Sequence, residues 1–198
     1  MTINKAILFY SLILSFFLNT ASHGEAPEGL SVGDMAPEIT AEDQFNKVFN
    51  LTSQLKQGPV VLIFYRGHWC KYCNRQLENL SDSLKYIFNK GASVITVTPE
   101  IMEFVDETSK RYGNTFRIIS DTSMTIMEMY KVNFKVGAVE NTKYKFGGIK
   151  LDVFNGENGP NLPVPATYII SQDRTIKYVF FNKDYKKRVS VETILENL

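Results

Sequence analysis

The chain has few of the residues that bind metal ions or build networks of disulfides. Its 198 residues include two cysteines and two histidines. A structural zinc site takes four protein ligands, usually cysteine and histidine. Beyond residue 24 the chain offers only Cys70, Cys73 and His68 as ligands of these types. The sequence therefore predicts no metal site, and nothing in it calls for an organic cofactor.

Charge of either sign is not in excess. Lysine and arginine number 22 and aspartate and glutamate 21, which gives a net charge of +1 without any strongly basic or acidic run. A nucleic acid or a membrane surface is therefore not an expected partner. With 44% hydrophobic and 22% charged residues, and no internal repeat, the composition is typical of one globular domain with a sizeable core.

The long apolar run of the sequence lies at its N-terminus. Ala6–Leu18 follows Lys5 and precedes small and polar residues. This run is shorter than the roughly 20 residues that a membrane span needs, and its flanks are typical of a secretory signal peptide. We predict a signal peptide at 1–24 and a mature domain at 25–198 that is periplasmic or secreted, with no stable membrane insertion after cleavage. An uncleaved N-terminal anchor is the alternative.

Hydrophobic patterning predicts alternating strands and helices. Continuous apolar runs at 60–65, 92–98 and 116–120 are typical of strands buried on both faces of a sheet. Apolar residues recur every three or four positions from Leu77 to Phe88, which predicts an amphipathic helix. Further helices are expected after a Thr98 cap, at 121–130 and at 190–198.

The C-terminal half adds a hairpin and an irregular segment. Strands at 166–170 and 175–181 are separated by the short turn SQDR, which predicts an antiparallel pair. Residues 133–161 contain five glycines and no steady period, so we expect a long loop or insertion, with one short amphipathic piece at 144–151. The order of elements predicts an α/β, thioredoxin-like fold. It has a mixed central sheet, helices on both faces and an insertion before the last hairpin.

Both cysteines lie at a predicted strand–helix junction. Cys70 would start the helix, where unpaired N–H groups and the helix dipole favour a thiolate, and Cys73 follows one turn later. A disulfide that closes so short a loop adds little stability, so a redox pair is favoured over a structural staple. Arg66 and a protonated His68 would add positive charge near the pair, unless they are exposed polar residues. Trp69 would shield one side of the cysteine pair.

A second signal lies far downstream, in LPVPATYII (162–170). Pro165 stands directly before a strand, where a thioredoxin-like sheet places a cis-proline facing the cysteine pair. We therefore predict a cis Val164–Pro165 bond, with the Val164 backbone pairing to an extended substrate. A trans proline that opens the strand is the alternative.

Several segments together resemble the AhpC/TSA group of the thioredoxin superfamily, in its peroxiredoxin-like branch. The resemblance implies a thioredoxin-like fold and a redox-active Cys70 with Cys73 as its resolving partner. It leaves Arg188 either in the site or in a structural corner. The segments are VGDMAPEIT (32–40), GPVVLIFYRGHWCKYC (58–73), GASVITVTPE (91–100), FRIISD (116–121), LPVPATYII (162–170) and DYKKR (184–188).

Two positions depart from the peroxiredoxin pattern. Typical members have Thr or Ser at the position of Gly67 and arginine at the position of Pro165. Those side chains hold the peroxide and stabilise its developing charge. Their absence favours disulfide exchange, whereas the resemblance along the whole chain favours peroxide reduction, with Arg66 or Arg188 as a substitute.

The leading hypothesis is a thiol-dependent oxidoreductase. Cys70 attacks a peroxide or a disulfide of a protein or small molecule, Cys73 resolves the intermediate, and an external dithiol reduces the resulting disulfide. The alternative is a non-catalytic, thioredoxin-like binding module that grips a partner protein with the 133–161 loop.

Overall fold

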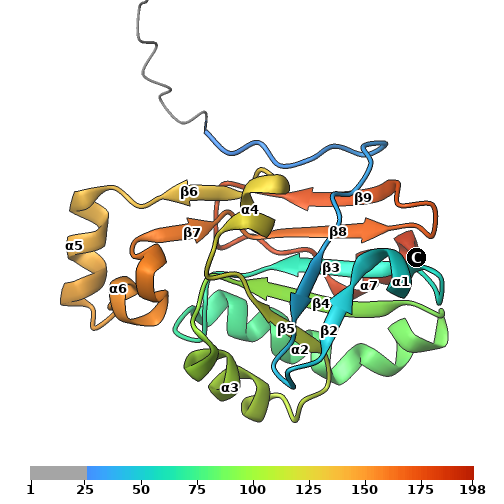
Figure 1. Ribbon diagram of the computed structural model, residues 1–198, viewed down its shortest axis with the longest axis horizontal. Helices are drawn as coiled ribbons and strands as arrows, with labels where there is room; N and C mark the ends of the chain where they lie inside the picture. The colour runs from blue at the N-terminus through green and yellow to red at the C-terminus, as the bar shows by residue number, and fades with distance from the viewer. Residues whose placement is uncertain (1–25) are drawn as a thin grey trace, which may run out of the picture.

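The computed structural model describes residues 26–198, so the predicted signal peptide at 1–24 lies outside the described residues. Its centre is a five-stranded sheet in the order β5-β4-β3-β8-β9 (Figure 1). β3, β4 and β5 are parallel, and β8 is antiparallel to both β3 and β9. The mixed sheet and its closing hairpin are thus confirmed. The strands are β3 (Val60–Phe64), β4 (Ser93–Thr98), β5 (Arg117–Ser120), β8 (Ala166–Ile170) and β9 (Ile176–Phe181).

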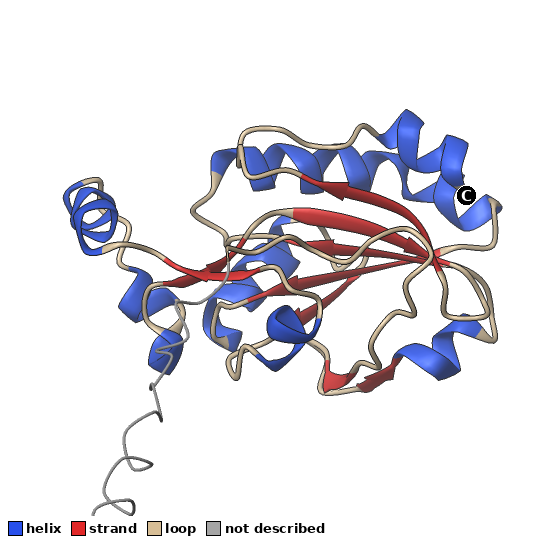
Figure 2. Cartoon of the chain, turned by 90° about the horizontal axis from the view of Figure 1, so that it is seen from above, coloured by secondary structure: helices blue, strands red, loops and turns tan. Residues whose placement is uncertain are grey.

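Helices cover both faces of this sheet, as predicted (Figure 2). Every residue of β3 is buried, and alternate side chains enter two different cores. Val61 and Ile63 belong to one core, and Val60 and Leu62 belong to the other. The helices of the first core are α2 (Lys71–Asn89), α3 (Met102–Arg111) and α7 (Val191–Asn197), and those of the second are α1 (Leu51–Leu55) and α4 (Thr125–Met129).

Helix α2 follows the apolar period that predicts it. Its buried residues include Leu77, Leu80, Leu84 and Ile87, which recur at steps of three and four and face the sheet. Burial of this stripe stabilises the helix more than the propensities of its residues do. The helix ends before Gly91, whose φ of +74° is a conformation that glycine adopts without strain.

The helix predicted after a Thr98 cap begins later than expected. β4 continues through Thr98, and α3 (Met102–Arg111) starts after Ile101. The intervening Glu100 is fully buried, and its side chain points to the loop before α2. Because the chain bends at Pro99 and Glu100 before α3 begins, Ile101 and not Thr98 is the N-cap residue.

Residues 133–163 form an ordered lobe, so the segment 133–161, expected to be a long loop or an insertion, is an insertion before the last hairpin. The lobe projects beyond the end of the sheet at which α2 begins (Figures 1 and 2). Its two strands pair antiparallel, and buried Val136, Leu151 and Leu162 form a small core. The elements are β6 (Asn133–Lys135), α5 (Ala138–Phe146), α6 (Leu151–Phe154), the 3-10 turn η1 (Gly156–Asn158) and β7 (Asn161–Pro163).

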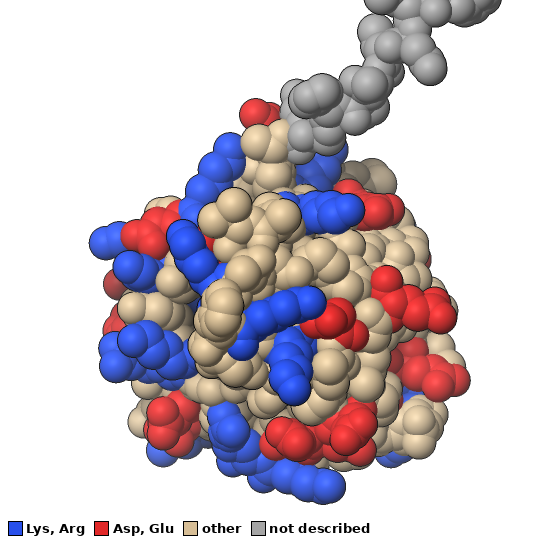
Figure 3. All heavy atoms as spheres, turned by 90° about the vertical axis from the view of Figure 1, so that its left-hand side faces the viewer, with Lys and Arg blue, Asp and Glu red and all other residues tan. Residues whose placement is uncertain are grey.

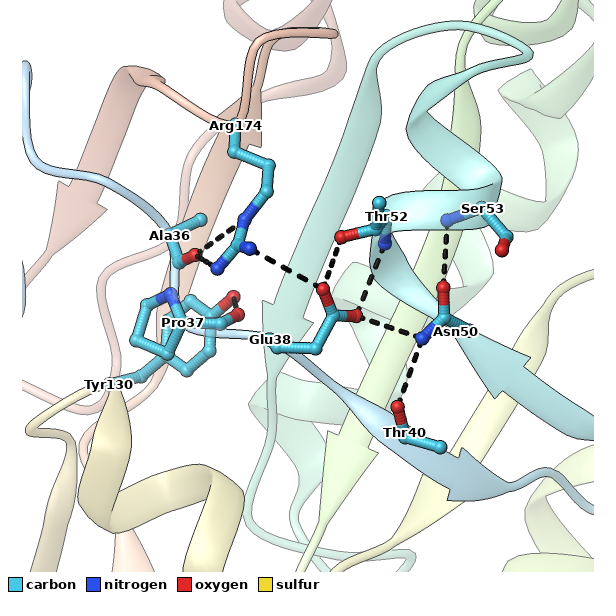
Figure 4. Close-up of polar contacts among 9 residues, drawn as sticks. All are labelled: Ala36, Pro37, Glu38, Thr40, Asn50, Thr52, Ser53, Tyr130 and Arg174. Atoms are coloured by element: carbon cyan, nitrogen blue, oxygen red, sulfur yellow. Dashed lines mark hydrogen bonds and ion pairs between the residues drawn. The ribbon is translucent and has the colours of Figure 1, made fainter.

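An N-terminal hairpin pairs β1 (Thr40–Glu42) antiparallel with β2 (Val48–Asn50). Polar contacts fasten the chain around it to the turn between β8 and β9 (Figure 4). Arg174 lies 3.5 Å from the Glu38 carboxylate and donates a hydrogen bond to the Ala36 carbonyl at 2.7 Å. Glu38 also accepts from the backbone of Thr52 at 3.2 Å. Within residues 26–198, the helices are too short or too polar to span a membrane.

Candidate functional site

The cysteine pair lies at the start of α2, as predicted. Cys70 is the N-cap residue, with an extended backbone, and Cys73 lies within the first turn. Both are free thiols. Cys70 is 4% exposed, whereas Cys73 is completely buried. Only Cys70 can therefore meet a substrate from outside.

Negative charge in the reduced pair is favoured on Cys73. Arg188 donates a hydrogen bond from Nη2 to Cys73 Sγ at 3.3 Å. Burial opposes ionisation of Cys73, but the hydrogen bond from the Cys70 thiol and the Arg188 guanidinium lower the pKa of Cys73 to about 6. The same hydrogen bond between the sulfurs, together with burial, raises the pKa of Cys70. The helix start was expected to favour a thiolate on Cys70, whereas the hydrogen bond from Arg188 favours one on Cys73.

Arg66 is buried beside the pair rather than exposed. Its side chain is 2% exposed and donates a hydrogen bond to the Tyr144 hydroxyl. The guanidinium carbon Cζ lies 4.4 Å from the ring centre of Tyr185 and 4.9 Å from that of Trp69. Its charge opposes the rise in the pKa of Cys70. Arg66 is thus held by stacked rings, in an arrangement that favours a cation.

Tyr144 is a site residue that the sequence pattern does not indicate. It lies 78 positions from Arg66, in a lobe without hydrophobic period. Tyr185 was contained in the segment DYKKR, but the sequence did not indicate its contact with Arg66. Both residues come to the site through tertiary structure, from the lobe and from the segment that follows β9.

His68 does not add its charge to the cysteine pair as expected. Its Nδ1 lies 2.6 Å from Oε1 of Glu100, and its backbone N–H also donates to this carboxylate. The imidazole stacks on Phe104, with ring centres 4.9 Å apart, and meets the edge of Phe154. Burial raises the pKa of Glu100, and the contacts from His68 oppose that rise. This buried pair fixes the loop that leads into Cys70.

Gly67 has no room for the side chain that peroxiredoxins carry there. Its φ is +144°, and a Cβ atom built on it would lie 2.5 Å from Oε1 of Glu100 and 2.6 Å from Nε1 of Trp69. Real Cβ contacts are never this short, and the conformation is strained for any L residue. The side chains of Glu100 and Trp69 therefore occupy the space that a Thr or Ser side chain would need at position 67.

Substitution of Gly67 by alanine should lower the free energy of unfolding by about 2 kcal/mol or more, because strain and overpacking add. Urea titration of the reduced proteins measures this change. Gly137→Ala is the matched control, since a Cβ atom there meets nothing within 4 Å. The control should change stability by less than about 1 kcal/mol. Equal effects of the two substitutions would contradict the close approach of Glu100 and Trp69 to Gly67.

The prediction of a cis bond before Pro165 is wrong. The described residues contain no cis peptide bond. β7 ends at Pro163 and β8 begins at Ala166, so the strands on either side hold this link in the trans form, which is the more stable one. The backbone N–H of Val164 donates to the Val132 carbonyl at 2.8 Å and is not free for a substrate.

Two adjoining hollows open around Arg66, and Cys70 lines the smaller one. The first has a volume of about 220 Å³ and is lined by Cys70 and Trp69, among others. The second has a volume of about 340 Å³ and is lined by Val164 and Pro165, among others. Arg66, Tyr144 and Tyr185 border both. Val164 and Pro165, which precede β8, and Trp69 and Cys70, which precede α2, thus lie on either side of Arg66.

The sequence matches a known family along most of its length. A model of the AhpC/TSA family matches residues 32–179. The chain is 30% identical over 107 residues to the thiol-disulfide oxidoreductase ResA of Bacillus subtilis strain 168, which covers 54% of this chain and 59% of that protein. It is 25% identical over 130 residues to ResA of Geobacillus thermodenitrificans, covering 64% and 68%. The chain thus spans about three fifths of the B. subtilis relative.

Solved structures show the same fold. The peroxidoxin BcpB of Mycobacterium tuberculosis superposes with a TM-score of 0.66 at 17% identity, over 85% of this chain and 96% of that one. The thioredoxin domain of a thiol-disulfide oxidoreductase from Bacteroides vulgatus gives a TM-score of 0.56 at 16% identity, over 84% and 97%. The predicted thioredoxin-like fold is therefore confirmed.

Proposed function

The chain belongs to the AhpC/TSA family of thioredoxin-like proteins, and we propose that it is a thiol-dependent oxidoreductase that exchanges its Cys70–Cys73 dithiol with a disulfide substrate. One observation carries the proposal: a free thiol borders a hollow, and a second, completely buried thiol lies one helical turn away and accepts a hydrogen bond from Arg188. The names of the ResA relatives support this reaction class.

The reaction begins with Cys70, because only this sulfur is accessible. Its proton passes to the Cys73 thiolate, and the Cys70 thiolate attacks one sulfur of the substrate disulfide. The substrate S–S bond breaks, and one arm leaves as a thiolate with the electron pair. Cys73 then gives its proton to this departing thiolate and attacks the Cys70 sulfur. The mixed disulfide breaks, and the second arm leaves as a thiolate. Two electrons have passed to the substrate, and the protein holds a Cys70–Cys73 disulfide.

Arg188 serves the second of these steps. A resolving thiol must be ionised when the mixed disulfide forms, and burial alone would keep Cys73 protonated. The guanidinium on Sγ favours the thiolate instead. An external dithiol would then restore the reduced pair. We further propose, from the N-terminal sequence alone, that residues 1–24 direct the chain to the periplasm or out of the cell.

Peroxide is a second candidate substrate, because the buried cation of Arg66 lies beside Cys70 and would stabilise charge on a leaving oxygen. The closed position at Gly67 and the proline at 165 argue for a slow reaction. Arg188, the other possible substitute for the missing arginine, instead contacts Cys73.

Stopped-flow mixing of the reduced protein with insulin or with hydrogen peroxide separates these candidates. Trp69, the single tryptophan, borders the Cys70 hollow and provides the fluorescence signal. We expect insulin to oxidise the pair, and hydrogen peroxide to react at about the rate of a free thiol. Rapid oxidation by peroxide, with no reaction toward insulin, would make peroxide rather than a disulfide the better candidate substrate.

A further inference from the structure

Arg66 is a buried cation that the protein leaves without a counter-charge. Its side chain is 2% exposed, and no ion pair of the described residues includes it. Its Nε has no hydrogen-bond partner, and one of its terminal nitrogens donates to a neutral hydroxyl. Burying an unpaired charge is costly, and stacked rings recover only part of that cost. The negative charge of the cysteine pair compensates it only in part, because Arg188 already contacts Cys73.

The hollow beside Arg66 is apolar. Its floor includes Phe134, Pro163, Val164 and Pro165. Its volume of about 340 Å³ is at the lower end of the range for small-molecule sites, so it fits one ring or a short alkyl arm. It meets the smaller hollow of Cys70 at Arg66, so a ligand that lies on the apolar wall can reach both the cation and the sulfur.

Two other charged residues border the larger hollow, Glu140 and Lys183. They have opposite signs and are exposed, or nearly so, in contrast to Arg66. Over the end of the molecule that carries the lobe, basic and acidic side chains are interspersed (Figure 3). Selection for an anion would therefore depend on the buried guanidinium rather than on the charge of the surface.

We propose that these joined hollows, the Arg66 site, bind a small disulfide with an apolar arm that carries a carboxylate. The carboxylate pairs with Arg66, the arm lies against Tyr144 and the prolines, and the S–S bond faces Cys70. This inference rests on the proposed function and names its substrate class. The reaction is the exchange described above: the substrate disulfide is reduced to two thiols, and the Cys70–Cys73 pair is oxidised.

Rates of oxidation by three disulfides test the Arg66 site. Dithiobis(nitrobenzoate) has aromatic arms with carboxylates, dithiodipyridine has aromatic arms without charge, and cystamine has cationic aliphatic arms. Each rate is divided by that of free glutathione with the same reagent, which removes intrinsic reactivity. We expect the normalised rate to be at least tenfold higher for the nitrobenzoate than for either other disulfide. In Arg66→Gln this preference should fall at least tenfold, whereas the exposed, charge-matched Arg75→Gln should keep it.

A second measurement uses the wild-type protein alone and does not depend on the folding of a variant. Benzoate should slow alkylation of Cys70 by iodoacetamide, and the uncharged benzamide of the same shape should not. Normalised rates within threefold of one another, or equal effects of benzoate and benzamide, would overturn the Arg66 site and leave the proposed function standing. If none of the three disulfides oxidised the Cys70–Cys73 pair faster than it oxidised free glutathione, the proposed function itself would fail.

Discussion

Replacement of Cys70 by serine should lower the rate of insulin reduction by on the order of 10³-fold or more, because loss of a covalent nucleophile removes the reaction path. Cys73 cannot substitute for it, since its side chain is completely buried beneath Cys70. A serine hydroxyl at the same place is not ionised at neutral pH. Turnover with a dithiol as the electron donor measures the effect.

Cys73→Ser is the matched variant, and it should fail at a different step. It retains the accessible sulfur, so it should form a mixed disulfide and then stop. Intact-mass spectrometry should show one substrate arm attached to Cys70. If the single variants and the double variant all kept wild-type turnover, the dithiol would not be the site. Binding of a partner through the 133–163 lobe would then be the better explanation.

Substitution of Arg188 by alanine should have the second large effect, on the titration of the reduced pair. In the wild type, thiolate absorbance in the ultraviolet should rise with a midpoint near the pKa of Cys73, about 6. Removal of the guanidinium should move this midpoint upward by about one unit or more, since a close opposite charge shifts a pKa by about 1–3 units. The resolving step at pH 7 should slow accordingly.

The same pKa shift predicts a pH dependence of stability. The pKa of Cys73 is lower in the folded protein than its ordinary value of 9.0. The thiolate therefore adds stability that is fully present above pH 9 and is lost as the pH falls through about 6. Reduced wild type should lose more stability over this range than Arg188→Ala does.

Lys187→Ala is the control for both experiments, because Lys187 is exposed and contributes only its backbone carbonyl to Arg188, at 2.6 Å. It should titrate as the wild type does. An Arg188→Ala variant with an unchanged midpoint would show that the guanidinium does not set the charge of the pair.

The parts of the site that the sequence predicts are those with a local signal. The unbroken apolar run of β3 and the period of α2 predict a strand–helix junction, and Cys70 caps the helix there. Trp69 borders the pair as expected. Each of these follows from spacing within about twenty residues. The closing hairpin, β8 and β9, has an equally local pattern.

The parts that the sequence missed depend on distant contacts. Glu100 lies 32 positions from His68, and nothing in the order of residues indicates that the two pair. Tyr144 belongs to a lobe whose core has three buried residues, Val136, Leu151 and Leu162, which are too far apart in the sequence to show a period. The hydrogen bond between Val164, directly before Pro165, and Val132 likewise joins residues that are far apart in the sequence.

Redox titration of the wild-type protein, followed by intact mass and Trp69 fluorescence, tests the dithiol most directly. The two thiols should be lost together in one two-electron transition that forms a Cys70–Cys73 disulfide. Its midpoint should lie between those of a reductant and an oxidant of this fold, about −270 and about −120 mV. Thiols that oxidise independently, or that form only mixed disulfides with the redox buffer, would contradict a paired active site.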